Sequence, residues 1–110
     1  MKHKKILFVC TGNTCRSPMA EAALRAELKR HKIRWYTVSS AGLRAQEGAP
    51  MSENARVALS RAGIPYPEAF RARKLTEKMI REAYAVVCMT REQAERIRSA
   101  NVTSMAVFAG

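Results

Sequence analysis

The sequence predicts an α/β fold in which a four-stranded parallel sheet is flanked by helices. Segments rich in β-branched and apolar residues alternate with segments of helical periodicity, and this alternation favours parallel strands joined by right-handed crossovers. A polar loop follows the first apolar segment, at the carboxyl end of a strand, where ligands of such sheets bind. We expect the strand order 2-1-3-4, with this loop after strand one.

The length and composition fit a single globular domain. The chain has 110 residues, of which 47% are hydrophobic and 26% charged, as in ordinary soluble domains. Its net charge is +11, and all nine acidic residues are glutamate, because the sequence contains no aspartate. The basic residues are scattered without aromatic interleaving, so we expect no nucleic-acid partner. The charge is interpreted as a solvated surface or as steering of acidic partners.

The N-terminal segment and the cysteines bear on location and cofactors. Basic residues precede the apolar run 6–9, but this run is too short for a signal peptide, and no stretch is long enough to span a membrane. We therefore expect a cytoplasmic protein without membrane attachment. Cys10, Cys15 and Cys88 lack metal-ligand spacing and the two histidines are isolated, so no metal or cofactor is expected. In a reducing compartment the cysteines should be thiols.

The first strand and the first helix flank the loop. The run Ile6–Val9 is apolar throughout, as in a strand buried on both faces. Ser17 is a good N-cap and Pro18 suits the first helical position, so the helix should run from 18 to 32. The residues predicted to face the core are Met19, Ala20, Ala23, Leu24 and Leu28. Those predicted to face solvent are Glu21, Arg25, Glu27 and Lys29.

The next two elements are a strand and a helix. Residues 34–39 are rich in β-branched and aromatic side chains and predict the second strand. The following loop, Leu43–Pro50, should lie near the loop that follows strand one. Ser52 is expected to cap a helix that Gly63 ends. The inner face of this helix is predicted to carry Ala55, Ala58, Leu59 and Ala62.

The last part of the chain continues the alternation. A short helix over 75–83 should have Thr76 as its N-cap, and the apolar segment 84–89 predicts a third, central strand. Thr90 and Gln93 have the spacing of a capping box, which opens a helix reaching residue 98. A fourth strand is expected over 102–108.

The loop Cys10–Pro18 carries residues suited to phosphoryl transfer. Backbone N–H groups of a strand-to-helix loop can converge on a phosphate at the helix N-terminus, and Gly12 relaxes the dihedral demands of the loop. Arg16 supplies a bidentate donor for phosphoryl oxygens, and the surrounding donors should hold Cys10 as a thiolate. This arrangement indicates phosphoryl transfer through cysteine. The alternative is that Cys10 is a buried core thiol and Arg16 a solvated residue.

This phosphate-binding loop resembles the signature of the low-molecular-weight protein tyrosine phosphatase family, with the sequence Cys10-Thr11-Gly12-Asn13-Thr14-Cys15-Arg16-Ser17-Pro18. The segments 39–42, 72–76 and 88–90 extend the resemblance along the chain. The resemblance implies the same strand order and a turn at 39–42. It also implies a phosphatase that acts on phosphorylated proteins through a phosphocysteine.

The resemblance further implies roles for individual residues. Cys10, Arg16 and Ser17 would be catalytic, and Asn13 and Ser40 would brace the loop. The residues that would bind phosphate are Thr11, Gly12, Asn13, Thr14, Cys15 and Arg16.

Thr14 favours the protein arginine phosphatase branch of this family. Tyrosine phosphatases of the family usually carry a larger aliphatic residue there, whereas a short hydroxyl side chain leaves room and a partner for a guanidinium. The Leu43–Pro50 loop also lacks an aromatic side chain that could stack on phosphotyrosine. Phosphoarginine and phosphotyrosine both remain open as substrates.

Two departures from the family pattern stand out. Phe70 replaces a histidine that braces the loop asparagine in many relatives, so that network should be rebuilt or weakened.

The family's general acid is an aspartate in a loop after the fourth strand, followed by a last helix. Residues 1–110 are expected to form one phosphatase-like domain without that acid loop and helix, and therefore with slow turnover. An uncovered sheet flank should favour a homodimer. Glu47 lies in a loop that could face the site, but nothing in the sequence positions it.

Two other functions stay open. In an arsenate-reductase-like redox enzyme, Cys10 would attack arsenate and Cys15 or Cys88 would resolve the intermediate. In a non-catalytic remnant, the loop would bind phosphate without turnover. Cys15 would either capture an oxidised Cys10 as a disulfide or pack inward as a small hydrophobic residue.

Overall fold

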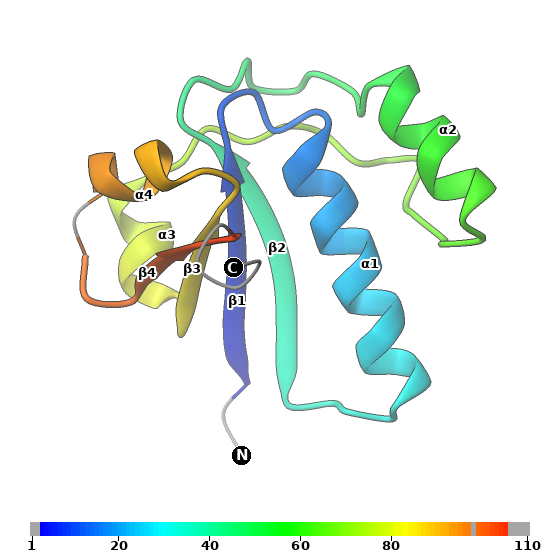
Figure 1. Cartoon of the computed structure of the whole chain (residues 1–110), viewed down its shortest axis with the longest axis horizontal. Helices are drawn as coiled ribbons and strands as arrows, with labels where there is room; N and C mark the ends of the chain where they lie inside the picture. The colour runs from blue at the N-terminus through cyan, green and yellow to red at the C-terminus, as the bar shows by residue number, and fades with distance from the viewer. Residues whose placement is uncertain (1–2, 98, 106–110) are drawn as a thin grey trace.

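The computed structural model describes residues 3–97 and 99–105 and has the expected α/β architecture. Its four parallel strands follow the order β2-β1-β3-β4, which confirms the predicted topology. The strands are β1 (Lys4–Cys10), β2 (Tyr36–Gly42), β3 (Ala85–Cys88) and β4 (Val102–Ser104). The helices are α1 (Arg16–Arg30), α2 (Glu53–Arg61), α3 (Glu77–Glu82) and α4 (Arg91–Ile97). Figure 1 shows α1 and α2 on one side of the strands and α3 and α4 on the other.

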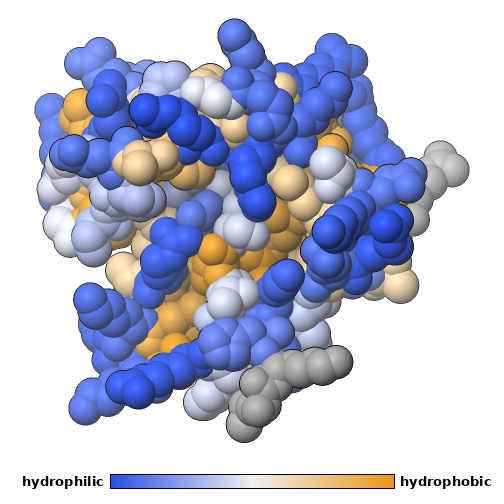
Figure 2. Space-filling view, turned by 180° about the vertical axis from the view of Figure 1, so that it is seen from behind, coloured by the Kyte–Doolittle hydropathy of each residue, from blue (hydrophilic) through white to orange (hydrophobic). Residues whose placement is uncertain are grey.

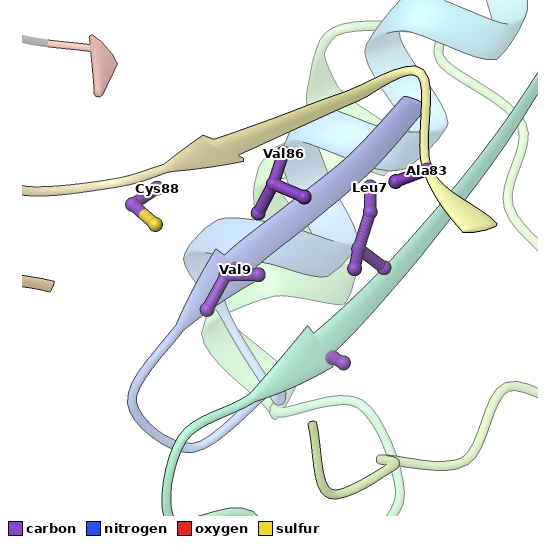
Figure 3. Packing of buried hydrophobic residues seen from close by; sticks show 6 residues of the cluster. Leu7, Val9, Ala83, Val86 and Cys88 are labelled. Carbon is purple, nitrogen blue, oxygen red and sulfur yellow. The ribbon is translucent and has the colours of Figure 1, made fainter. Parts of the chain in front are cut away.

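The main core lies between the sheet and the helices α3 and α4. Leu7 and Val9 of β1 stand in register with Val86 and Cys88 of β3, and all four side chains are buried (Figure 3). Because side chains alternate along a strand, these residues share the face that α3 and α4 cover. The partly buried side chains packed on this cluster are Leu43, Leu75, Met79, Ile80, Ala94, Ile97 and Val102. The cluster fixes the two central strands at the end where the loop begins.

A second apolar cluster holds α2 against α1. Its buried members are Ala22, Met51, Ala55 and Leu59. Ala58 and Ala62, predicted on the inner face of α2, are exposed instead, because the contact with α1 is narrow and two positions fill it. Ser52 caps α2 as predicted, accepting a hydrogen bond from the Ala55 N–H at 3.2 Å.

Two further predicted caps are confirmed. Thr76 accepts a hydrogen bond from the Met79 N–H at the start of α3. At the start of α4, the Thr90 N–H donates to Gln93 Oε1 at 3.0 Å and the Gln93 N–H donates to Thr90 Oγ1 at 3.2 Å. This reciprocal pair is the capping box read from the sequence.

The predicted bounds of the second and fourth strands need revision. β2 runs through Gly42, so the segment 39–42 is strand rather than turn, because its backbone pairs with β1 as far as Cys10. β4 covers Val102–Ser104, and the part of the fourth strand expected over 106–108 lies outside the described residues, as does residue 98 of the predicted fourth helix.

The predicted inner face of α1 is wrong by a fraction of a turn. The helix begins at Arg16, and its buried residues are Ser17, Pro18, Glu21 and Ala22. Residues expected on that face, including Met19 and Leu24, are only partly buried. Glu21, expected in solvent, is 8% exposed because it accepts hydrogen bonds from Ser40 and Arg25. Hydrogen bonds of Glu21, together with the apolar packing of Ala22, thus accompany the observed orientation of α1.

Two surface properties complete the description. No helix within the described residues is long and apolar enough to cross a membrane. Figure 2, seen from the side opposite to Figure 1, shows apolar residues gathered in a hollow between ridges of hydrophilic residues.

Candidate active site

The candidate site forms where β1 ends and α1 begins. Cys10 is the last residue of β1, and α1 begins at Arg16. Because β1 lies between β2 and β3, the connection after β1 leads to its neighbour on one edge, and the connection after β2 passes back across β1 to β3. This is a topological switch point, where the carboxyl ends of neighbouring strands frame a ligand site.

The Cys10 sulfur is surrounded by hydrogen-bond donors. The side chain is 7% exposed, and its Sγ accepts the Asn13 N–H at 3.2 Å. Ser17 Oγ lies 2.9 Å from the same sulfur and is fully buried. Ser17 is therefore not the N-cap that the sequence suggested: Cys15 occupies that position without a side-chain cap bond, because the serine hydroxyl is already engaged beneath the loop.

Asn13 links the Ser17 hydroxyl to the backbone of a distant segment. Its Oδ1 accepts the Arg73 N–H at 2.8 Å, so its Nδ2 is the group that donates to Ser17 Oγ, also at 2.8 Å. With that oxygen accepting from Asn13, the serine proton is available for the Cys10 sulfur. The sulfur thus lies within hydrogen-bond distance of the Asn13 N–H and of the Ser17 hydroxyl.

The bracing of the loop differs in detail from the expected one. Asn13 is fully buried with φ +56°, a left-handed conformation that asparagine tolerates better than most residues. The hydroxyl of Ser40 donates to Glu21 Oε1 at 2.6 Å, while its carbonyl accepts from Arg73 Nε at 3.2 Å. Ser40 therefore reaches Asn13 through Arg73. Phe70 packs on the α1–α2 cluster, and the Arg73 N–H supplies the bond to the asparagine.

Gly42 allows β2 to approach the loop closely. A Cβ atom at this position would stand 2.7 Å from the carbonyl oxygen of Thr11 and 3.0 Å from Asn13 Cβ. The next two residues continue the contact, since the Leu43 N–H donates to the Cys10 carbonyl and the Arg44 N–H to the Thr11 carbonyl. The predicted neighbourhood of the Leu43–Pro50 loop is therefore confirmed at its first two residues.

A pocket of about 450 Å³ opens above the sulfur. The loop residues that line it are Cys10, Thr11, Gly12, Asn13, Thr14, Cys15 and Arg16. The residues that line it from other segments are Leu43, Arg44, Thr90, Glu92, Gln93 and Arg96. Gln93 also ties α4 to the loop, because its Nε2 donates to Thr11 Oγ1 at 3.1 Å. All the predicted phosphate-binding residues thus face one pocket, with Ser17 buried beneath them.

The sequence analysis missed the contribution of α4. Glu92 lines the pocket, whereas Glu47, the carboxylate considered from the sequence, accepts the Lys74 N–H at 2.6 Å and is not part of the lining. The capping box could have indicated this, because it places the first turn of α4 just after β3, at the same edge of the sheet as the loop. For Arg44 and Arg96, no comparable sequence pattern predicted a place in the pocket lining.

The remaining cysteines differ in environment. Cys15 lines the pocket and packs on the α1–α2 cluster. Cys88 is fully buried in the main core, and this burial raises the pKa of its thiol to about 11. All three cysteines are free, and the described residues contain no group of three or more side chains that could hold a metal ion.

Fold and site together define a class of α/β proteins in which a central strand ends in a cysteine and a Cys-x5-Arg-Ser loop opens the first helix. Within that class, residues 5–108 match the family model described as low molecular weight phosphotyrosine protein phosphatase. The chain belongs to this family.

Individual relatives place the chain near two kinds of phosphatase. It is 43% identical over 86 residues to a protein-arginine-phosphatase of Geobacillus stearothermophilus, an alignment that covers 78% of this chain and 54% of the relative. It is 34% identical over 97 residues to the low molecular weight protein-tyrosine-phosphatase Ptp of Acinetobacter johnsonii, covering 88% of this chain and 64% of the relative. The chain therefore spans between about half and two thirds of the length of these relatives.

Solved structures agree with the fold. A mutant of YwlE from Bacillus subtilis superposes with a TM-score of 0.87 at 32% identity, covering 96% of this chain and 73% of that structure. The YwlE arginine phosphatase from Geobacillus stearothermophilus gives a TM-score of 0.82 at 35% identity, covering 96% and 68%. The strand order and the position of the cysteine loop are those of this family.

Proposed function

We propose that this chain is a cysteine-dependent protein phosphatase that hydrolyses phosphoarginine or phosphotyrosine through a phosphocysteine. The observation that carries the proposal is the pair of donors at the Cys10 sulfur: the Asn13 N–H at 3.2 Å and Ser17 Oγ at 2.9 Å. Donors at these distances stabilise a thiolate, which is the nucleophilic form of cysteine.

In the first step, the loop holds the phosphoryl group and Cys10 attacks it. Backbone N–H groups of residues 11–16 and the Arg16 guanidinium bind the three phosphoryl oxygens and stabilise their charge in the transition state. An S–P bond forms, and the P–O bond of phosphotyrosine or the P–N bond of phosphoarginine breaks. The electron pair stays on the leaving oxygen or nitrogen, which takes up a proton.

In the second step, water regenerates the enzyme. A water oxygen attacks phosphorus, the S–P bond breaks, and inorganic phosphate leaves as the sulfur returns to the thiolate. The Ser17 hydroxyl, oriented by Asn13, donates to the departing sulfur and so makes it a better leaving group.

Relatives support both the intermediate and the substrates. A structure of a YwlE arginine phosphatase mutant with a phosphorylated active-site serine superposes on this chain with a TM-score of 0.86 at 32% identity. That protein holds a phosphoryl group on an active-site side chain. Named relatives include arginine and tyrosine phosphatases, and Thr14 in the pocket lining favours a guanidinium, for which it leaves room and supplies a hydroxyl partner.

Trapping the intermediate tests the proposal. The protein is mixed with p-nitrophenyl phosphate, quenched in acid, and digested for mass spectrometry. We expect a phosphoryl group on Cys10, no turnover by Cys10→Ser, and retained labelling in the control Cys88→Ala. A protein that binds phosphate at the loop but releases no nitrophenol would instead support the non-catalytic alternative.

The arsenate-reductase alternative receives less support. Cys88 is fully buried, and its thiol keeps its proton to a pKa of about 11, which makes it a poor resolving group. Arsenate-dependent oxidation of a cysteine pair in the purified protein would revive this alternative.

A further experiment concerns the group that protonates the leaving oxygen or nitrogen. The 110 residues contain no aspartate, and among the described residues Glu92 is the carboxylate that lines the pocket. For a polypeptide of these 110 residues we propose slow turnover of poor leaving groups, since a positioned general acid contributes about 10²–10⁴-fold. A series of substituted phenyl phosphates should give rates that fall steeply as the phenol pKa rises. A flat dependence that becomes steep in Glu92→Gln would assign the proton to Glu92.

The proposal also includes an oligomeric state and a cellular location. A homodimer is supported by the apolar hollow of Figure 2, because exposed apolar surface tends to be covered by association. Sedimentation as a monomer at high concentration would contradict it. We also propose a cytoplasmic location, because the proposed reaction requires Cys10 as a free thiol and reducing compartments preserve thiols.

A further inference from the structure

More arginines line the pocket than the phosphate-binding loop itself supplies. Its charged lining residues are three arginines, Arg16, Arg44 and Arg96, and one glutamate, Glu92. Arg16 belongs to the phosphate loop, but the other two arginines come from segments far from it in the sequence. We call Arg44 and Arg96 the arginine rim.

Arg44 is held in place through its backbone. Its N–H donates to the Thr11 carbonyl at 2.9 Å, and the preceding Leu43 N–H donates to the Cys10 carbonyl at 3.0 Å. The side chain is exposed and lines the pocket. The base of Arg44 is therefore fixed to the phosphate loop, while its guanidinium can meet a ligand bound there.

Arg96 is positioned from the other side of the pocket. It lies on α4, whose first turn is fixed by the capping box and by the bond from Gln93 Nε2 to Thr11 Oγ1 at 3.1 Å. Its side chain is also exposed and lines the pocket. The two rim arginines thus approach the pocket from different elements, both anchored to Thr11.

The rim arginines have no anionic partner in the part of the chain that the structure describes. Arg25, Arg30 and Arg81 pair with glutamates on their own helices, but neither rim arginine forms an ion pair, although Glu92 precedes Arg96 by one helical turn. Glu92 offsets one of the three positive charges at most. With Arg16 assigned to the phosphoryl group, the two rim arginines and Glu92 together still leave net positive charge beside the phosphate site, which can meet negative charge on the ligand.

We propose that the arginine rim selects phosphorylated residues that have acidic neighbours in their peptide chain. This inference rests on the proposed phosphatase function and names the substrate class of the same site. A carboxylate one or two residues from the phosphorylated side chain would meet Arg44 or Arg96 as the phosphoryl group enters the loop. Because the contacts are exposed, each should be worth only a few-fold, acting on kcat/KM through binding and fading at high salt.

Three phosphotyrosine peptides test the inference, identical except for glutamate, glutamine or lysine at the positions that flank the phosphotyrosine. At low salt we expect kcat/KM to fall in that order, by about 3–10-fold from glutamate to glutamine. Arg44→Gln and Arg96→Gln should each reduce this ratio, mainly through KM. Arg91→Gln is the matched control, because Arg91 lies on the same helix, is exposed, and is not part of the pocket lining.

The outcomes distinguish a specific effect of the rim arginines from a general effect of net charge. They also distinguish failure of this inference from failure of the phosphatase proposal. Equal kcat/KM for the three peptides would overturn the inference, as would an Arg91→Gln variant that lowers the ratio as much as Arg96→Gln. If neither these peptides nor p-nitrophenyl phosphate is hydrolysed, the phosphatase proposal fails instead. The dissociation constants of the same peptides for Cys10→Ser, measured by calorimetry, then decide the rim alone: a preference for glutamate supports it, and equal affinities overturn it.

Discussion

The base and the rim of the pocket are built on opposite principles. At the base, Asn13 and Ser17 are fully buried, and their polar atoms hydrogen-bond to each other, to the Cys10 sulfur and to the Arg73 backbone. At the rim, Arg44 and Arg96 are exposed and form no ion pair with any described residue. The buried groups of the base therefore have a fixed geometry before any ligand binds. The exposed arginines of the rim can still change conformation when a ligand binds.

The energetic reason for the difference is desolvation. A buried polar group without a partner costs about 1–3 kcal/mol, so the base can exist only as a fully satisfied network. An exposed guanidinium keeps its water and carries no such cost. In the proposed function, the base therefore provides the single arrangement that bond making needs, and the rim provides selection among ligands. The following predictions test this division.

The largest effect is expected for a substitution of Arg16, an exposed residue that should nevertheless act in bond making. It is exposed like the rim, yet it faces the phosphoryl oxygens of the proposed mechanism. Arg16→Lys replaces the planar fork by a single ammonium, and we expect kcat on p-nitrophenyl phosphate to fall about 10²–10³-fold, as for the loss of one transition-state donor. Thermal denaturation should be unchanged. A drop of only a few-fold would assign Arg16 to the rim.

Asn13 should reveal how much stability the base stores. Asn13→Ala leaves the Arg73 N–H without its acceptor and places an alanine at φ +56°, so we expect a loss of about 1–3 kcal/mol in the free energy of unfolding in urea. Asn13→Gly removes the same hydrogen bonds without the left-handed strain. It should therefore recover about 1 kcal/mol of that loss. Equal stability of the two variants would show that the backbone at this position relaxes.

Thr14 lies between base and rim, partly buried in the pocket wall. Thr14→Ile adds volume and removes a hydroxyl, which should shift preference from phosphoarginine toward phosphotyrosine. We expect the ratio of the two kcat/KM values to change about tenfold, the usual scale for one small group in a pocket. An unchanged ratio would place specificity in the rim instead.

Cys88 gives the smallest effect, because it lies in the core away from both regions. Its pKa is raised to about 11 by burial, so the folded protein holds this thiol proton more tightly than the unfolded chain does. Its contribution to stability should be complete below about pH 9 and decline toward pH 11. At neutral pH, iodoacetamide should modify Cys88 only after urea is added. Rapid modification of the native protein would mean that the core opens locally.

The sequence predicted the features that depend on neighbouring residues. Ser52, Thr76 and the Thr90–Gln93 pair are caps whose partners lie three residues away, and all three predictions are confirmed. The strand order and the loop after β1 followed from the alternation of elements and from the family resemblance.

The features that the sequence did not predict depend on distant partners. Glu21 is buried because Ser40, on β2, donates to it, and Asn13 meets Arg73 across 60 positions of sequence. Serine is a residue type that often caps helices, but the hydroxyl of Ser17 instead contacts the sulfur of the cysteine seven residues earlier. Helical periodicity contains none of this information, which explains the error in the orientation of α1.

Gly42 has a consequence for libraries of variants. Glycine in a strand is usually unfavourable, so design rules would replace it with valine or threonine. Here any side chain would push on the Thr11 carbonyl at 2.7 Å and thus on the loop that holds the proposed nucleophile. A screen that selects for turnover should therefore enrich glycine at position 42 strongly, and a screen for strand propensity alone would discard it. The residue that contributes no side chain sets how closely the second strand can approach the loop between Cys10 and α1.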